Sequence, residues 1–363
     1  MSDSPTPWYR YFTWAIVVTV VGLLASVALG WQSTGTWPGT LTVFFICSVL
    51  AVLEISFSFD NAIVNAKTLK TMTPQWQKRF LTWGILIAVF GMRIVFPLLI
   101  VVVAASMGPI EALRFAIVEP EQYARMMTDA HLPIVAFGGT FLLMVGLSYF
   151  FDHEKDVHWV EWIEKHLARF ASVKGIEIAF ALGLVMLISR FLPTDDAATF
   201  ISAAVYGLLT YLIVEIVGAF LDQSRDGTNA AARGGLGAFL YLEVLDASFS
   251  FDGVVGAFAL SQNLFVIAIG LGIGAMYVRS LTIMLVERGT LSSYRFLEHG
   301  AFYAILVLSV VMYLQTLIHI PEAFTGLVGA ALVGLGLWSS IRWNRNALRR
   351  QPSSSTTSTK SAD

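Results

Sequence analysis

Two short polar stretches interrupt a chain that is otherwise strongly apolar. LEISFSFDNAIVNA begins at Leu53, and EVLDASFSFDGVVGA, which begins at Glu243, repeats the same order of residue types. The two copies contribute a set of carboxylates, hydroxyls and amides, namely Glu54, Ser56, Ser58, Asp60, Asn61 and Asn65, then Asp246, Ser248, Ser250 and Asp252. Such oxygen donors favour hard divalent cations, Mn²⁺, Mg²⁺ or Ca²⁺, over soft metals.

The repeat extends beyond the polar stretches. Glu54 aligns with Asp246 and Asp60 with Asp252 at constant spacing, and the apolar segment that follows each copy carries a glycine and then an arginine. These pairs are Gly84 with Arg93 and Gly270 with Arg279. The sequence therefore predicts a duplicated helix pair, over about residues 39–105 and 236–286.

Composition identifies the environment of these residues. Hydrophobic residues make up 56% of the chain and charged residues 13%, and apolar runs of about twenty residues, enough to cross a bilayer, recur along it. The sequence predicts an all-α, polytopic bundle in a membrane domain of residues 12–341, without a soluble enzyme domain. The ten expected spans are about 12–31, 39–66, 81–105, 132–151, 173–190, 197–221, 236–258, 263–286, 300–318 and 322–341, with eight or nine also possible.

Lysine and arginine are unevenly distributed between the two sides that this topology defines. Of the 23 such residues, all but five fall in segments on the side that holds both chain ends. The exceptions are Arg114, Arg125 and Arg190 on the other side, and Arg93 and Arg279 within spans. By the positive-inside rule, both ends are cytoplasmic in a bacterial-type inner membrane, and the two repeats have inverted topology. Inverted repeats are typical of transporters whose substrate site lies near the bilayer midplane.

Charged groups within spans need a physical reason, because each acid costs about 2.5–3.5 kcal/mol at the centre of an inserted helix. We expect Arg93 and Arg279 to pair with motif carboxylates, and Glu215 to be a further candidate ligand or proton carrier. On a continuous helix Glu54 and Asn61 share a stripe from which Asp60 points away. Either each motif helix is polar on two faces or it unwinds locally, and the pattern does not decide between them.

Other segments carry less information. The only cysteine, Cys47, lies in an apolar run and reads as a small buried hydrophobe. The segment from Asp152 is predicted to be an interfacial amphipathic helix with a solvated charged face, although its histidines could bind a surface metal. Residues 108–130 are expected to be partly helical. Residues 1–11 form a cytoplasmic N-terminus, and residues 342–363 a basic, disordered cytoplasmic tail.

The pair of motifs resembles those of the TerC family of bacterial membrane proteins, associated with tellurium resistance, or an allied uncharacterised family of the lysine-exporter superfamily. The resemblance covers residues 53–93 and 242–279. It implies a transporter fold and, for several members, manganese efflux, with Asp60 and Asn61 in the first motif and Asp246 and Asp252 in the second. Gly253 departs from the serine usual in the second motif, and Glu54 has no firm family counterpart.

Together these features predict a transporter that exports a divalent cation, most of all Mn²⁺, as a transported ion rather than a permanent cofactor. Asp60, Asp252, Asp246, Glu54 and Asn61 would hold the ion, with nearby serines, Asn65 and Glu215 in support. Two alternatives stay open: an exporter of an organic cation or amino acid, and a non-transporting scaffold in stress response. The expected partners are the cation and the bilayer, with no nucleic acid, and homo-oligomers are possible.

Overall fold

The computed structural model describes residues 7–84, 87–105, 107–152, 157–170, 173, 175–223, 235–318 and 320–350. Throughout these residues the regular structure is helical, with no strand, which confirms the all-α prediction. Within the described residues, seven helices are long and apolar enough to cross a membrane. They are α2 (Thr13–Thr34), α3 (Trp37–Phe57), α9 (His131–Phe150), α12 (Thr194–Gln223), α14 (Leu264–Glu287), α16 (Leu297–Gln315) and α17 (Glu322–Arg350). The chain is therefore a multi-pass helical protein of the membrane type.

The other three predicted spans are also helical, but each has a feature that sets it apart. The described residues of the predicted span 81–105 belong to the π-helices η1 (Phe80–Gly84) and η2 (Ile87–Val95) and to helix α6 (Phe96–Ala105). Residues 173–190 contain the short α11 (Ile176–Ser189). Residues 236–258 lie in α13 (Leu236–Leu260), whose three acids lower its hydropathy. A count from hydropathy alone therefore misses the helix with the second motif.

The two motif helices differ in their continuity. The first divides at Ser58, where φ is −105° and ψ is 22°, so that α3 ends at Phe57 and α4 (Phe59–Thr71) begins. The second stays one helix, α13, although it contains Gly253. The break falls between Glu54 and Asp60 and so changes their relative direction without any Gly or Pro.

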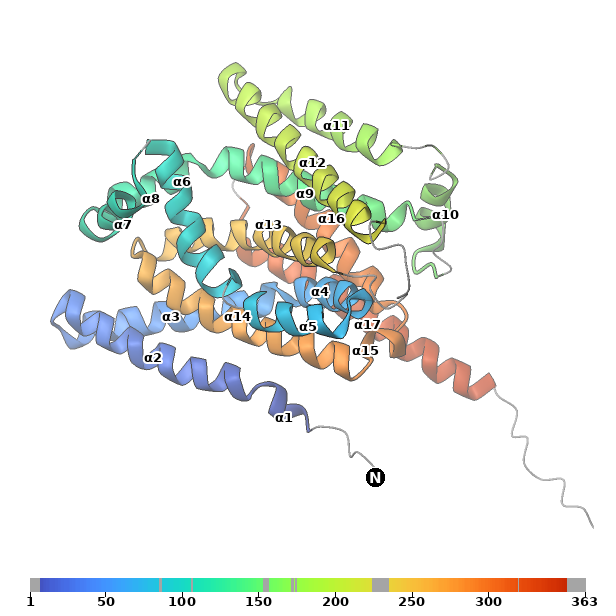
Figure 1. Ribbon diagram of the computed structural model, residues 1–363, viewed down its shortest axis with the longest axis horizontal. Coiled ribbons are helices and arrows are strands. Elements are labelled where there is room, and N and C mark those ends of the chain that lie inside the picture. The colour runs from blue at the N-terminus through green and yellow to red at the C-terminus, as the bar shows by residue number, and fades with distance from the viewer. Residues whose placement is uncertain are drawn as a thin grey trace, which may run out of the picture.

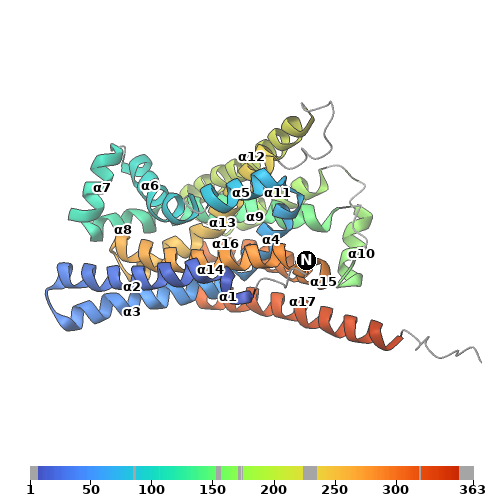
Figure 2. The ribbon, with the colours of Figure 1, turned by 60° about the horizontal axis from the view of Figure 1, so that its bottom comes forward.

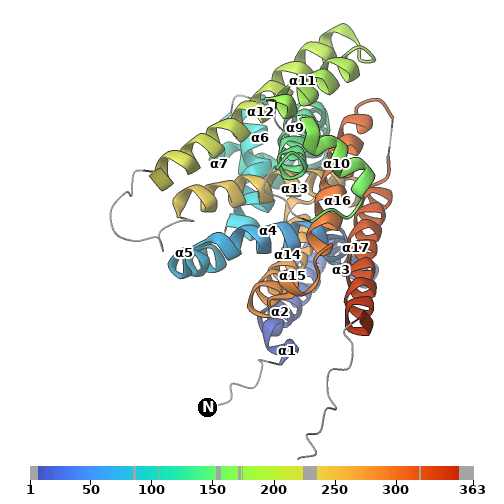
Figure 3. The same ribbon diagram turned by 90° about the vertical axis from the view of Figure 1, so that its right-hand side faces the viewer.

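The helices stack in layers across the long axis of the molecule. In Figure 1, α11 and α12 lie at the top, α9, α16 and α13 in the middle, and α14, α3 and α2 below. Figure 3 shows α17 along one side of this stack, where it packs against α16. Of these seven helices, α9 is the most enclosed, since 78% of its most apolar 18-residue stretch is buried. The motif helices α4 and α13 lie between it and α14 (Figure 1).

One end of the bundle gathers basic residues, and we call it the basic end. It carries Lys70 at the end of α4, Lys78 and Arg79 in α5 (Pro74–Arg79), and Arg288 after α14. Lys70 Nζ donates to Ser292 Oγ of α15 (Thr290–Ser293) at 3.2 Å, and the Arg288 guanidinium lies 5.8 Å from the Tyr11 ring in α1 (Trp8–Tyr11). Asn344 of α17 donates to the Ser293 carbonyl at 2.8 Å. Both described ends of the chain therefore lie at the basic end, opposite the α2–α3 turn (Figure 2).

The shorter segments agree only partly with the sequence. Residues 108–130 form α7 (Pro109–Val118) and α8 (Pro120–Asp129), and the segment after Asp152 forms α10 (Glu161–Phe170). Cys47 is buried and its thiol lies 3.4 Å from the Val266 carbonyl oxygen. Helix α17 continues to Arg350, so residues 342–350 of the predicted tail are helical, while residues 351–363 lie outside the described part.

Candidate functional site

The two sequence motifs meet through a direct side-chain contact. The amide nitrogen of Asn61, near the start of α4, donates a hydrogen bond of 2.8 Å to the Asp246 carboxylate of α13. The two residues are 185 positions apart in the chain, and Asn61 is only 6% exposed. The tertiary structure thus brings the two copies of the motif around one place inside the bundle.

Arg93 is held by a motif carboxylate. It sits in η2 and forms an ion pair with Glu54 of α3; Arg93 is buried and Glu54 is partly buried. A buried charge is tolerated in such surroundings only when it is paired. Arg279 on α14 forms no ion pair with any described residue, but it lies on the wall of the cavity that Glu54 and Asp246 also line.

Glycines bring α14 close enough to α3 to fix the position of Glu54. A Cβ built on Gly274 would lie 2.4 Å from Glu54 Cβ and 3.0 Å from the Ala51 carbonyl oxygen. A Cβ on Gly270 would lie 2.6 Å from Leu50 Cβ. The repeat pattern singled out Gly270, and the structure explains it as a point of close helix approach, because only glycine lets the backbones meet at this distance.

A first cavity, of about 50 Å³, lies between α4, η2, α13 and α14. Its polar lining consists of Glu54, Asn61, Asn65, Arg93, Asp246, Arg279 and Thr282. The Oδ1 atoms of Asn61 and Asn65 are buried without a hydrogen-bond partner among the described residues. Buried acceptors normally have a partner, so these two oxygens can accept from water or coordinate a cation.

A second cavity, of about 60 Å³, lies between the first motif and helices α16 and α17. Asp60, which is 5% exposed, faces this cavity together with Glu54, Ser58 and Phe249. The opposite wall is apolar apart from Thr325, whose buried hydroxyl has no hydrogen-bond partner in the described residues. Glu54 therefore borders both cavities, whereas Asp60 and Asp246 border different ones.

The remaining predicted residues occupy varied positions. The hydroxyls of Ser56 and Ser248 donate to carbonyls one turn back in their own helices, at 2.7 and 2.9 Å, and Ser250 lines neither cavity. Glu215 is exposed on α12 and also lies outside both cavities. The side chain of Asp252 lies outside the described part of the structure, although its backbone belongs to α13.

The described motif acids, which do not include the side chain of Asp252, border two separate cavities. Among the described side chains, no three of the types His, Cys, Asp and Glu are grouped closely enough to hold a metal ion. Asp246 lines the first cavity, Asp60 lines the second cavity, and Glu54 lines both.

Glu243, an acid that the sequence already places three residues before Asp246, has a buried Oε1 with no described hydrogen-bond partner but lines neither cavity. The structure adds two threonines that the sequence analysis did not select. Thr282 and Thr325 supply hydroxyls to the first and second cavities. The proximity of Glu243 to the second motif was a usable signal. A single threonine near the start of the apolar α17 carried none, because α17 lies outside the repeat.

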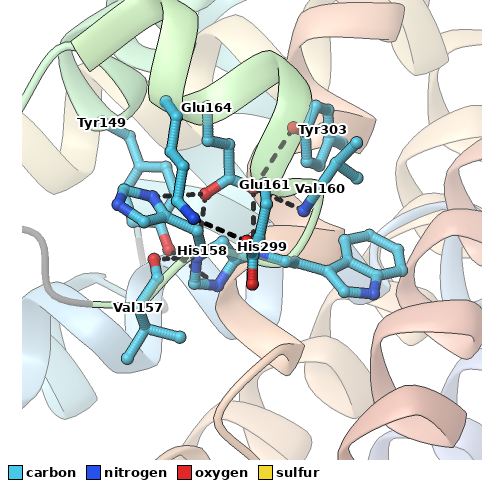
Figure 4. Close-up of polar contacts among 10 residues, drawn as sticks. Tyr149, Val157, His158, Val160, Glu161, Glu164, His299 and Tyr303 are labelled. Carbon is cyan, nitrogen blue, oxygen red and sulfur yellow. Dashed lines mark hydrogen bonds and ion pairs between the residues drawn. The ribbon is translucent and has the colours of Figure 1, made fainter.

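A separate polar cluster joins α10 to α16, and Figure 4 shows its contacts. The Glu164 carboxylate is buried and accepts hydrogen bonds from the backbone amides of Trp159 and Val160, both at 3.1 Å, and from Tyr303 at 3.2 Å. It also lies 3.3 Å from His158 and 3.5 Å from His299. The predicted solvated face of this segment is therefore wrong at Glu164, which serves as an internal anchor.

The rest of α10 behaves as a surface helix. Its exposed Glu161 accepts a hydrogen bond of 2.6 Å from Lys165, and this contact lowers the pKa of Glu161. On the other side of the anchor, His299 contacts Tyr149, which stacks on Phe302 at 3.8 Å between ring centroids. Lys67 of α4 lies 4.1 Å from the Tyr149 ring centroid, so the anchor and the first motif helix are connected.

Fold and site thus define a helical membrane-type protein with polar cavities enclosed by duplicated motifs. Residues 59–347 match the model of a family described as a protein of unknown function, DUF475, and the chain belongs to this family. The match includes Asp60, Asn61 and the whole second motif, and begins after Glu54. No curated protein and no solved structure matches the chain. The match shows a family of unknown function, and it shows neither the TerC family nor the lysine-exporter superfamily.

Proposed function

We propose that this chain is a membrane transporter for a divalent metal cation, with Mn²⁺ as the first candidate and export as its direction. The hydrogen bond between Asn61 and Asp246 carries the proposal, because it joins the two acidic motifs inside a bundle of membrane-type helices. Acids inside a bundle of membrane-type helices are energetically costly, so their presence there indicates a function. The role proposed is transport and not catalysis.

The charges around the first cavity indicate what a cation must do there. Glu54 and Asp246 supply two negative charges, and Arg93 and Arg279 supply two positive ones, so the described arrangement is balanced. A divalent cation entering this cavity would replace Arg93 on Glu54 and gain the free amide oxygens of Asn61 and Asn65. Arg93 then acts as a surrogate cation that keeps Glu54 paired when no ion is present.

The donor chemistry supports a hard cation. Each of the candidate ligands offers oxygen, and Mn²⁺, Mg²⁺ and Ca²⁺ all accept oxygen ligands. The resemblance of the motifs to those of the TerC family favours Mn²⁺ within this group. Asp60 would receive the ion in the second cavity, and Asp252 is the remaining predicted ligand.

The test is transport by the purified full chain in proteoliposomes. We expect Mn²⁺ flux to exceed that of empty liposomes and to fall to background in Asp60→Asn and Asp246→Asn. Glu215→Gln is the matched control, because Glu215 is an acid on the membrane-type helix α12 and its side chain lines neither cavity. Flux of Asp60→Asn equal to that of the wild type would refute a cation path through the motifs.

One observation favours an amino-acid exporter as a second candidate. The first cavity presents carboxylates and guanidinium groups together, and this mixture of charges matches a zwitterion. Its volume of about 50 Å³ argues against it, because pockets for organic ligands are typically about 300–1,000 Å³. Competition assays with amino acids in the same liposomes separate the two: inhibition of Mn²⁺ flux by an amino acid would favour the second candidate.

A further inference from the structure

We propose that Glu54 is the gate of the transport path, a movable carboxylate that separates an inner from an outer vestibule. The inference rests on the proposed function. It adds to that function the residue that would close the path and the position in the bundle at which it would do so. It is carried by the positions of the two cavities along the bundle and by the contacts that hold Glu54 between them.

The first cavity belongs to the half of the bundle near the basic end. Asn65 lies at the middle of α4, one helical turn beyond Asn61 toward Lys70, and Thr282 lies in the half of α14 that leads to Arg288. Phe80, another lining residue, starts η1 directly after the basic helix α5. Because the positive-inside rule assigns the basic end to the cytoplasm, this cavity is the inner vestibule.

The second cavity belongs to the opposite half. Gly253 lies in the part of α13 that leads away from the basic end, since α13 begins beside α5, where the Phe239 and Trp76 ring centroids are 5.6 Å apart. Leu308 and Thr325 lie near the end of α16 and the start of α17, both opposite the basic end. This cavity is therefore the outer vestibule, and its lining is mainly apolar.

Glu54 is the described residue that lines both vestibules. Arg93 holds its carboxylate on the inner side, while a Cβ on Gly253, in the outer vestibule, would lie 3.5 Å from Glu54 Oε2. Gly274 packs directly against the Cβ and Cγ atoms of Glu54, and the space at the Gly274 α-carbon admits no group larger than a hydrogen. The carboxylate thus sits at the partition, within reach of both sides.

The break at Ser58 completes the device. Glu54 lies in the last turn of α3 and Asp60 in the first turn of α4, so a small change at Ser58 turns one acid relative to the other. A cation that replaces Arg93 on Glu54 can then be passed to Asp60 in the outer vestibule when the carboxylate rotates. The return of Glu54 to Arg93 closes the partition behind the ion.

The experiment measures the sidedness of two cysteines. Cys47→Ala removes the only native thiol, and Thr282→Cys or Thr325→Cys then places one thiol in the inner or the outer vestibule. A charged, membrane-impermeant methanethiosulfonate reagent is added to inside-out or right-side-out vesicles. We expect Thr282→Cys to react only from the side of the basic end and Thr325→Cys only from the other side.

Glu54→Gln added to either cysteine variant should raise modification from the wrong side by about tenfold, equivalent to about 1.4 kcal/mol. Gly274→Ala, which keeps both charges but displaces Glu54, should do the same and replaces Glu54→Gln if that variant does not fold. Two cysteines accessible from one and the same side, or sidedness unchanged in the variant used, would overturn the gate. Correct sidedness without Mn²⁺ flux would overturn only the proposed transport of Mn²⁺.

Discussion

The ion pair between Glu54 and Arg93 allows a quantitative test by a double-mutant cycle. Glu54→Gln removes the carboxylate and leaves Arg93, whose side chain is 4% exposed, without this partner. Arg93→Met leaves the Glu54 carboxylate, which is 12% exposed, without its guanidinium. The double variant Glu54→Gln/Arg93→Met removes both charges and keeps similar side-chain volumes.

The expected magnitudes follow from burial. Removing one partner of a buried pair costs about 3–5 kcal/mol, because the other charge stays desolvated, whereas replacing both partners can be close to neutral. Each single variant should therefore lose about 3–5 kcal/mol of unfolding free energy. The double variant should lose far less than the sum, which gives a coupling energy of at least about 2 kcal/mol, within the range for residues in direct contact.

The assay is chemical unfolding of the purified chain in detergent micelles, monitored by far-ultraviolet circular dichroism. The dependence of the unfolding free energy on denaturant concentration should be the same for all four proteins. Additive losses, with a coupling energy near zero, would refute the assignment of Glu54 and Arg93 as a pair. A double variant as unstable as the worse single variant would show that the arginine depends on other groups.

Further outcomes are expected at two other places. Gly274→Ala should lower the free energy of unfolding by about 1–3 kcal/mol through overpacking against Glu54. The control Gly334→Ala, where a Cβ meets nothing within 4 Å, should change the free energy of unfolding little. Equal effects of the two substitutions would contradict the close approach of α14 to α3. Glu164→Gln should speed hydrogen exchange of the α10 backbone amides, because the buried carboxylate accepts from two of the amides that precede the helix. The exposed Glu161→Gln on the same helix should leave exchange unchanged, and similar exchange in both variants would show that Glu164 is no anchor.

Several features of the fold could be predicted because they depend on local pattern. Apolar runs and their spacing predict the helices, since a chain in a bilayer must satisfy its backbone hydrogen bonds within each segment. The duplicated spacing of acids, serines, glycine and arginine indicated which helices line the polar cavities. A helix in the segment that begins at Asp152, observed as α10 at Glu161–Phe170, followed from the helical spacing of its apolar residues.

Other features depend on contacts between distant segments. The break at Ser58 has no local cause in the form of Gly or Pro, and the continuous α13 contains a glycine, so tertiary packing decides where the helix divides. Thr325 entered the site only because α17 packs beside the first motif. Glu164 looked like one more charge on a solvated face until α16 supplied Tyr303 and His299 around it.

The sequence by itself determined that this is a multi-pass helical protein with two acidic motifs, because hydropathy and residue spacing are properties of the chain alone. The tertiary structure decided how those acids are distributed. It placed Asp246 and Asp60 on different cavities, with Glu54 between them held by Arg93. The physical reason is that a shared site depends on the packing angle of helices far apart in the chain, and no local pattern encodes that angle.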